Sequence, residues 1–163
     1  MPEIRKARVE DLNSILKLWK RFVKHQRDLG IGSGEDLLPG MKDNATDIVL
    51  DYFGRTIRSR NGFLIVMEDE GEIVGYLLAR IEKDIPVFKN DRIGYISDIY
   101  LEERFRKRGL GSKMFDESMR WFKEKGVENV TLKVLSYNSE AHDAYRRWGF
   151  KDVYYDMNFR INR

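Results

Sequence analysis

The chain has 163 residues with 30 basic and 27 acidic side chains, and its net charge is +3 at neutral pH. Charges of both signs are interspersed, which argues against general nucleic-acid binding, and no apolar run reaches the length of a membrane span. There is no cysteine, which excludes disulfides and a cysteine nucleophile. His25 and His142 are too isolated for a metal site. We expect residues 1–163 to form a single domain of a cytoplasmic protein, with a homodimer as one option for its assembly.

Hydrophobic periodicity predicts the elements of the first third of the chain. A short strand at 4–7 precedes a helix that Glu10 and Asp11 open. The apolar face of this helix consists of Leu12, Ile15, Leu16, Trp19, Phe22 and Val23. From 26 to 44, glycines and a proline are expected to prevent regular structure, and this segment is either a lid or binding loop or a connector without function. A second helix, capped by Thr46 or Asp47, follows.

Strand patterns and one long amphipathic stretch dominate the middle of the chain. Two strands, at 63–67 and 72–81, flank an acidic turn and predict an antiparallel hairpin. A strand ending at Leu101, a helix from Leu110 to Gly126 and a strand at 129–135 then predict a crossover. Strands joined in this way lie parallel, so the sheet should be mixed and the fold α/β.

The last part of the chain predicts one more helix and one more strand. Asn138 or Ser139 caps a short helix that Gly149 terminates. The final strand is expected from an alternation of apolar and polar side chains, with Val153, Tyr155, Met157 and Phe159 on its apolar face.

The turn before the long helix has the composition of an anion site. In Arg106-Lys107-Arg108-Gly109-Leu110-Gly111, basic residues and two glycines stand where the helix begins. A helix N-terminus offers unpaired backbone N–H groups, and glycines let an anion approach them closely. The surrounding cations, including Arg104, suit a ligand with several phosphates. The alternative is an ordinary solvated loop.

With these elements in this order, the chain resembles the GNAT superfamily of acetyl-coenzyme A-dependent N-acetyltransferases over nearly its whole length. The coenzyme signature of that family stands here as Arg106 to Gly111 after the strand Asp98-Ile99-Tyr100-Leu101. A later family signature stands as Asn138-Ser139-Glu140-Ala141-His142-Asp143-Ala144-Tyr145-Arg146-Arg147-Trp148-Gly149-Phe150. The two motifs are weak singly, but they occur together at family spacing around a crossover helix.

The resemblance implies a fold and a coenzyme site. It implies a mixed sheet that is splayed between its fourth and fifth strands and flanked by about four helices. Acetyl-coenzyme A would lie in the opening, with main-chain groups near Ile99 and Leu101 pairing with its pantetheine arm. The residues expected to bind it are Ile99, Tyr100, Leu101, Arg106, Lys107, Arg108, Gly109, Leu110, Gly111, Ser112, Asn138 and Tyr145.

Acetyl transfer to an amine requires a neutral nucleophile and a proton for the departing thiolate. Asp98 is the candidate base, because it is the carboxylate inside the predicted strand; the alternatives are a structural ion pair or water oriented by Tyr95 and Ser97. Its assistance is expected to matter most at low pH, where the amine is protonated. Tyr145 matches the family tyrosine that acts as general acid, with core packing as the alternative.

The leading hypothesis is therefore an enzyme that moves acetyl from acetyl-coenzyme A to a primary amine within a ternary complex. The acceptor stays open between a polyamine or other small amine, an aminoglycoside, and a protein N-terminus or lysine. Acidic residues of the irregular segment and its surroundings slightly favour a cationic amine; they are Glu35, Asp36, Asp43 and Asp47. The alternatives are a non-catalytic acetyl-coenzyme A-binding module and a nucleotide-phosphate binder, and the second lacks the glycine spacing of a P-loop.

Overall fold

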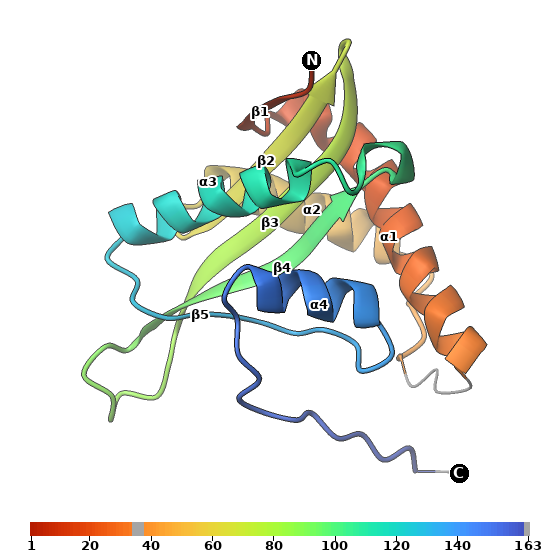
Figure 1. Ribbon diagram of the computed structural model, residues 1–163. Coiled ribbons are helices and arrows are strands. Elements are labelled where there is room, and N and C mark those ends of the chain that lie inside the picture. The colour runs from red at the N-terminus through yellow and green to blue at the C-terminus, as the bar shows by residue number, and fades with distance from the viewer. Residues whose placement is uncertain (34–37, 162–163) are drawn as a thin grey trace.

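A computed structural model describes residues 1–33 and 38–161, and these form a five-stranded sheet with helices on both faces (Figure 1). The strands are β1 (Glu3–Lys6), β2 (Gly62–Asp69), β3 (Glu72–Lys83), β4 (Arg92–Leu101) and β5 (Val130–Leu132). The helices are α1 (Leu12–Ser33), α2 (Ala45–Arg58), α3 (Leu110–Glu124) and α4 (Ser139–Arg147), with short 3-10 turns at Val9–Asp11 and Glu103–Phe105.

The strands follow one another across the sheet in sequence order. The first four pair antiparallel, and β4 pairs parallel with β5. The β2–β3 connection is the predicted hairpin, in which Glu70 and Gly71 both have positive φ, as a tight two-residue turn requires. The mixed α/β sheet expected from the crossover is confirmed.

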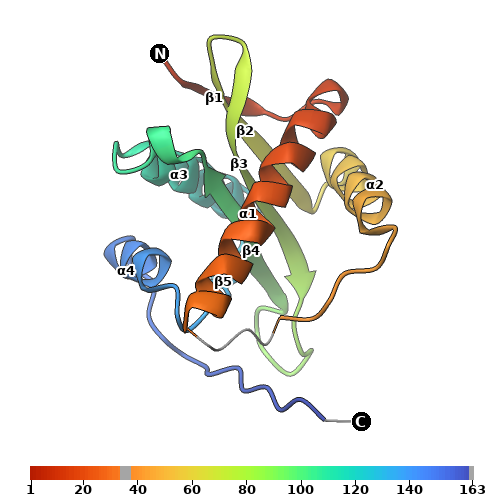
Figure 2. The same ribbon diagram turned by 90° about the vertical axis from the view of Figure 1, so that its right-hand side faces the viewer.

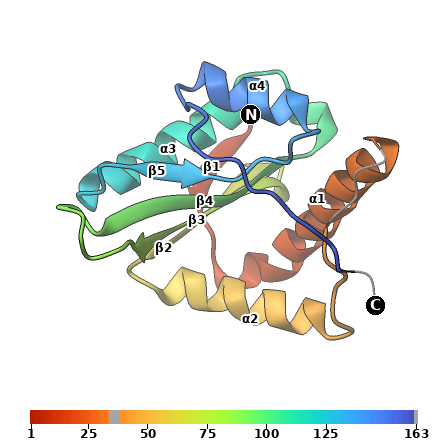
Figure 3. The same ribbon diagram turned by 90° about the horizontal axis from the view of Figure 1, so that it is seen from below.

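The two faces of the sheet carry two separate cores. Helices α1 and α2 cover one face, and α3 and α4 lie on the other (Figures 2 and 3). On the α3 face the buried side chains include Ile65, Leu77, Ile96, Met114 and Phe122. On the α1 and α2 face they include Ile15, Phe53, Val66, Tyr76 and Tyr100. Successive side chains of a strand point to opposite faces, so each strand contributes to both cores.

Three sequence-based expectations about element bounds need correction. Helix α1 continues to Ser33 instead of ending near residue 26; glycine lowers helix stability by about 1 kcal/mol but keeps its backbone N–H, so it does not force an end. Helix α2 begins at Ala45 with Asn44 as its N-cap, which places Thr46 and Asp47 in the first turn. Strand β5 has three residues, far fewer than predicted. Glu35 and Asp36 lie outside the described residues.

The predicted final strand is also wrong. Residues 150–161 form no helix or strand, although their apolar and polar side chains do alternate. Alternation shows that a segment can form a strand, but a strand also needs a neighbour with which to pair. Here the segment leaves α4 and runs away from the sheet (Figure 1). Separately, no helix in the described ranges is long and apolar enough to cross a membrane.

Candidate active site

The central feature is a gap between β4 and β5. These strands pair only where Gly94, Tyr95 and Ile96 face Val130, Thr131 and Leu132. Strand β4 continues for five residues to Leu101, and no strand of the described chain pairs with that half on its β5 side. The splay expected between the fourth and fifth strands is therefore present, and it leaves one edge of β4 open.

A β-bulge decides which groups of β4 face this gap. Leu78 pairs with Asp98 and Ala79 with Ile96, so Ser97 is an extra residue without a partner. Beyond the bulge, the Glu102 N–H donates to the Val74 carbonyl at 2.9 Å, which directs residue 102 toward β3. Because main-chain directions alternate along a strand, the N–H and C=O groups of Ile99 and Leu101 point into the gap.

The glycine turn lies at the N-terminus of α3. Gly109 is the N-cap with φ 73°, and a Cβ built there would meet no protein atom within 4 Å. The space where a side chain would stand is therefore open to a ligand. Gly111 differs, because a Cβ there would lie 3.6 Å from the Trp148 ring, an ordinary contact distance, so this position faces the tryptophan at the end of α4. The Trp148 indole N–H donates to Ser112 Oγ at 2.8 Å.

The arginines around the turn are partly engaged by the protein itself. Arg106 Nε donates to the Leu101 carbonyl at 2.8 Å, and its guanidinium lies over the Tyr100 ring. This bond fixes the turn to the end of β4. Arg104 donates to Glu102 at 3.2 Å and covers the Phe105 ring. Lys107 and Arg108 are exposed.

Asp98 lies on the α1 and α2 side of the sheet. Its Oδ2 accepts a 2.9 Å hydrogen bond from the Tyr76 hydroxyl. Burial raises the pKa of Asp98 to about 6, against the smaller opposing effects of the Tyr76 hydrogen bond and the Arg80 charge. A carboxyl with this pKa can change its protonation state near neutral pH, which is the property required of a general base.

Tyr145 reaches the same region from α4. Asn138 begins this helix by accepting the Ala141 N–H on its side-chain oxygen. The Tyr145 ring packs against the rings of Trp148 and Phe150, and its hydroxyl has no hydrogen-bond partner in the described part of the chain. Burial, with a contribution from the Asp98 charge, raises the pKa of Tyr145 to about 12. The phenol therefore keeps its proton throughout the neutral range.

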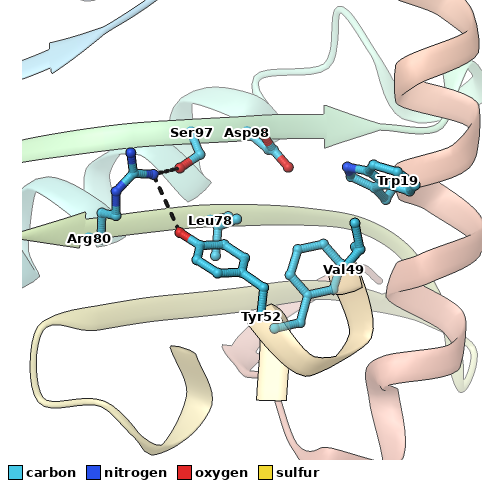
Figure 4. A pocket seen from close by; sticks show the side chains of 8 residues that line it. Trp19, Val49, Tyr52, Leu78, Arg80, Ser97 and Asp98 are labelled. Atoms are coloured by element: carbon cyan, nitrogen blue, oxygen red, sulfur yellow. Dashed lines mark hydrogen bonds between the residues drawn. The ribbon is translucent and has the colours of Figure 1, made fainter. Parts of the chain in front are cut away.

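A cavity of about 490 Å³ opens next to Asp98. It is lined by Trp19 of α1, Val49, Tyr52 and Phe53 of α2, Leu78 and Arg80 of β3, and Ser97 and Asp98 of β4 (Figure 4). Its walls are mostly aromatic and aliphatic, and an arginine and an aspartate also line it. It can hold a small molecule or the end of a chain.

Arg80 is held in this cavity from several sides. Its Nη1 donates to Ser97 Oγ at 2.6 Å and to the Tyr52 hydroxyl at 3.4 Å (Figure 4). Its guanidinium lies over the Tyr95 ring, with 4.3 Å between Cζ and the ring centroid, and Nε pairs with Glu82. No residue of the described chain bonds Nη2, so this nitrogen is available to an anionic or carbonyl oxygen.

Sequence reasoning identified only part of this site. It placed Asp98, Ser97 and Tyr95 together on β4, and the structure brings them together. It missed Arg80 and Tyr76, although the hairpin prediction contained the necessary signal. Alternate residues of β3 share a face, so Tyr76, Leu78 and Arg80 had to lie together on one face of that strand; the pairing of β3 with β4 then places Leu78 opposite Asp98. No local sequence pattern indicated that side chains of α1 and α2 would line the cavity. The described residues contain no cluster of potential metal ligands.

Comparisons with known proteins agree with this architecture. An N-alpha-acetyltransferase from Sulfurisphaera tokodaii is 32% identical over 63% of this chain, and the match spans 64% of that protein's length. A thialysine N-epsilon-acetyltransferase from Bos taurus is 26% identical over 92% of this chain and 84% of its own. The structure of a predicted acetyltransferase from Clostridium acetobutylicum with acetyl-CoA superposes with a TM-score of 0.78 at 20% identity, covering 97% and 96% of the two chains. The model of the acetyltransferase (GNAT) family matches residues 34–150, and the chain belongs to this family.

Proposed function

We propose that residues 1–163 act as one N-acetyltransferase domain that moves acetyl from acetyl-coenzyme A to a primary amine by direct attack within a ternary complex. The observation that carries this proposal is the position of Asp98. Its carboxyl, which has a raised pKa, lies between an acceptor-sized cavity and the β4–β5 gap. The charge of this carboxyl also raises the pKa of Tyr145, which lies on helix α4.

The open half of β4 and the glycine turn form the coenzyme side of the proposed site. The main-chain groups of Ile99 and the N–H of Leu101 are available to the amide groups of a pantetheine arm, whereas the Leu101 carbonyl already accepts a hydrogen bond from Arg106. The open space at Gly109 and the free N–H groups of the first turn of α3 fit a pyrophosphate. The Clostridium acetobutylicum protein, which shares this fold and was solved with acetyl-CoA, supports acetyl-coenzyme A as the ligand.

The proposed reaction assigns one proton transfer to each ionisable group. Asp98 accepts a proton from the acceptor ammonium, and the neutral amine attacks the thioester carbon. The nitrogen of the resulting tetrahedral intermediate then loses its second proton to water. When the carbon–sulfur bond breaks, the Tyr145 hydroxyl donates its proton to the departing thiolate. Both residues are then restored by exchange with water, and the net products are an acetamide, coenzyme A and a proton.

The cavity also indicates the kind of acceptor. A polyamine or an aminoglycoside carries only positive charges and would be repelled by Arg80. An amine whose molecule also carries a carboxylate or carbonyl oxygen suits the cavity better, with the amine at Asp98 and the oxygen at Arg80 Nη2. Amino acids and peptide N-termini have this character. The names of two relatives support this class of acceptor. One is an N-alpha-acetyltransferase, and the other acetylates the amino acid thialysine.

A matched pair of acceptors tests the proposal. L-lysine and cadaverine carry the same terminal amine, but only lysine has a carboxylate. Acetyl-coenzyme A consumption should be faster with lysine or a short peptide than with cadaverine. Arg80→Gln should remove that preference, because it raises KM for lysine about tenfold or more and lowers KM for cadaverine by removing the repelling charge. Faster turnover of cadaverine than of lysine would disprove the proposed class of acceptor but not the proposed acetyl transfer.

The competing hypothesis is a module that binds acetyl-coenzyme A without turnover. A thermal shift with acetyl-coenzyme A but no transfer to any amine, peptide or aminoglycoside would support it. The assigned base argues against it, because a carboxyl with a raised pKa at an enclosed site destabilises the protein at neutral pH and is retained more readily where it has a chemical task.

A further inference from the structure

The hydroxyl of Tyr76 is held next to Asp98 by the packing of its ring. The Tyr76 side chain is fully buried and contacts the Phe53 ring of α2, with 6.1 Å between the two ring centroids. In the sheet, Leu78 of β3 pairs with Asp98 of β4. Tyr76 is therefore the diagonal neighbour of Asp98 on the same face, within reach of a long side chain. A ring enclosed in this way cannot turn away without opening the core, so its hydroxyl stays beside the carboxyl.

The hydroxyl proton of Tyr76 is donated to one of the two carboxyl oxygens. It goes to Asp98 Oδ2 at 2.9 Å. Burial raises the pKa of Tyr76 well above its usual value, with a further contribution from the Asp98 charge, so this phenol remains a donor throughout the neutral range. Asp98 Oδ1 accepts no hydrogen bond within the described chain, where every completely buried polar side-chain atom has a partner. Oδ1 is therefore reached by solvent at the cavity that Asp98 lines (Figure 4).

We propose that Tyr76 is a positioning residue for the acetyl transfer: by holding Oδ2, it leaves Oδ1 of Asp98 as the oxygen that takes the proton from the acceptor amine. This inference rests on the proposed function. A free carboxylate can turn either oxygen toward the amine or away from it, whereas this one presents a single oxygen in a fixed orientation. The same hydrogen bond favours the ionised form of Asp98, because a donor stabilises the negative charge.

The side chains around Asp98 show which groups can influence its titration. They come from every element packed around it and are Tyr76 and Arg80 of β3, Tyr95 of β4, Tyr145 of α4, Tyr52 of α2 and Trp19 of α1. Free phenol and guanidinium groups do not titrate between about pH 5 and 8. Burial raises the pKa of Tyr95 and the pKa of Tyr145 further. A change in the titration of Asp98 on loss of the Tyr76 hydroxyl can therefore be assigned to their hydrogen bond.

The variant Tyr76→Phe tests this, because it removes the donor and keeps the ring. The pKa of Asp98, followed by the carbon-13 resonance of its carboxyl, should rise by about one unit, since a hydrogen bond to a charged group is lost. The acid limb of kcat/KM for acetylation of lysine should move up equally, which makes the variant about tenfold less active well below that limb. Use of one acceptor for all variants cancels the titration of the acceptor itself.

The matched control removes a buried hydroxyl elsewhere. Ser118 of α3 is fully buried and donates to the Phe115 carbonyl at 2.7 Å. Ser118→Ala should lose stability but move neither the pKa of Asp98 nor the acid limb. If the Tyr76 hydroxyl is likewise only structural, Tyr76→Phe will behave as this control does, and the proposal is overturned.

Further outcomes separate this proposal from the proposed function. Site-specific 3-fluorotyrosine at position 76 keeps the hydroxyl and makes it a stronger donor, so it should lower both midpoints, and an upward shift would contradict the proposal. An acid limb that stays in place while the pKa of Asp98 rises would also overturn it. Failure of the proposed function looks different: the wild type then transfers acetyl to no amine. The carboxyl titration needs no turnover and still decides whether Tyr76 holds Asp98.

Discussion

Replacing Asp98 by asparagine should stabilise the protein at neutral pH. Burial raises the pKa of Asp98 from its usual 3.8 to about 6, so the folded protein holds this proton more tightly than the unfolded chain does. The side chain therefore favours folding at low pH, and that contribution is lost as the pH rises through about 6. Asparagine stays neutral, and its carbonyl oxygen can still accept the Tyr76 hydroxyl.

The magnitude follows from the pKa difference. One pKa unit corresponds to about 1.4 kcal/mol, so a rise of roughly two units gives an upper value of roughly 3 kcal/mol. The free energy of unfolding of Asp98→Asn should exceed that of the wild type by up to this amount above about pH 7. The difference should fall below roughly 1 kcal/mol near pH 4, because residue 98 is then neutral in both folded proteins.

Urea denaturation of both proteins across this pH range measures the difference. At neutral pH the melting temperature should rise by about 6–12 °C for a chain of this size. The exposed Asp116 on α3 provides a control, and Asp116→Asn should stay within about 0.5 kcal/mol of the wild type at every pH. A flat difference for Asp98→Asn, or a loss of stability above about pH 7, would refute the account of Asp98 as a carboxyl with a burial-raised pKa.

The other predictions concern activity and coenzyme binding. Turnover lost in Asp98→Asn should be greatest above about pH 6, where the wild-type carboxylate is ionised, and this reverses the low-pH expectation drawn from the sequence alone. Gly109→Val should weaken acetyl-coenzyme A binding tenfold or more by isothermal titration; Gly126→Val, at the other end of α3 with φ 72° and equally open space, should cost comparable stability without that loss. Tyr145→Phe should lower turnover by roughly 10² with an unchanged melting temperature, because the hydroxyl bonds no described residue; full turnover would remove it from the mechanism.

Local sequence patterns predicted much of the fold, because interactions between neighbouring residues determine where most helices and turns form. The apolar period of α3, the Glu70-Gly71 turn and the Asn138 cap each follow from a few neighbouring residues. The cavity could not be predicted in the same way. Trp19, Tyr52 and Arg80 come from three separate elements, and their meeting depends on how α1 and α2 pack on the sheet. The final strand failed for a related reason, since its pairing partner is not encoded in its own alternation.

The Ser97 bulge connects the two halves of the candidate site. In a regular strand, Ser97 and Asp98 would point to opposite faces, and Asp98 would lie on the same face as Tyr100 but away from Ser97. With the extra residue, Ser97 and Asp98 both line the cavity, so the hydroxyl that receives Arg80 and the candidate base stand side by side. The same insertion reverses the main-chain direction beyond it, which turns Ile99 and Leu101 rather than Tyr100 toward the gap. One inserted residue therefore sets both the arrangement of the cavity, the proposed acceptor side, and the open strand edge, the proposed coenzyme side.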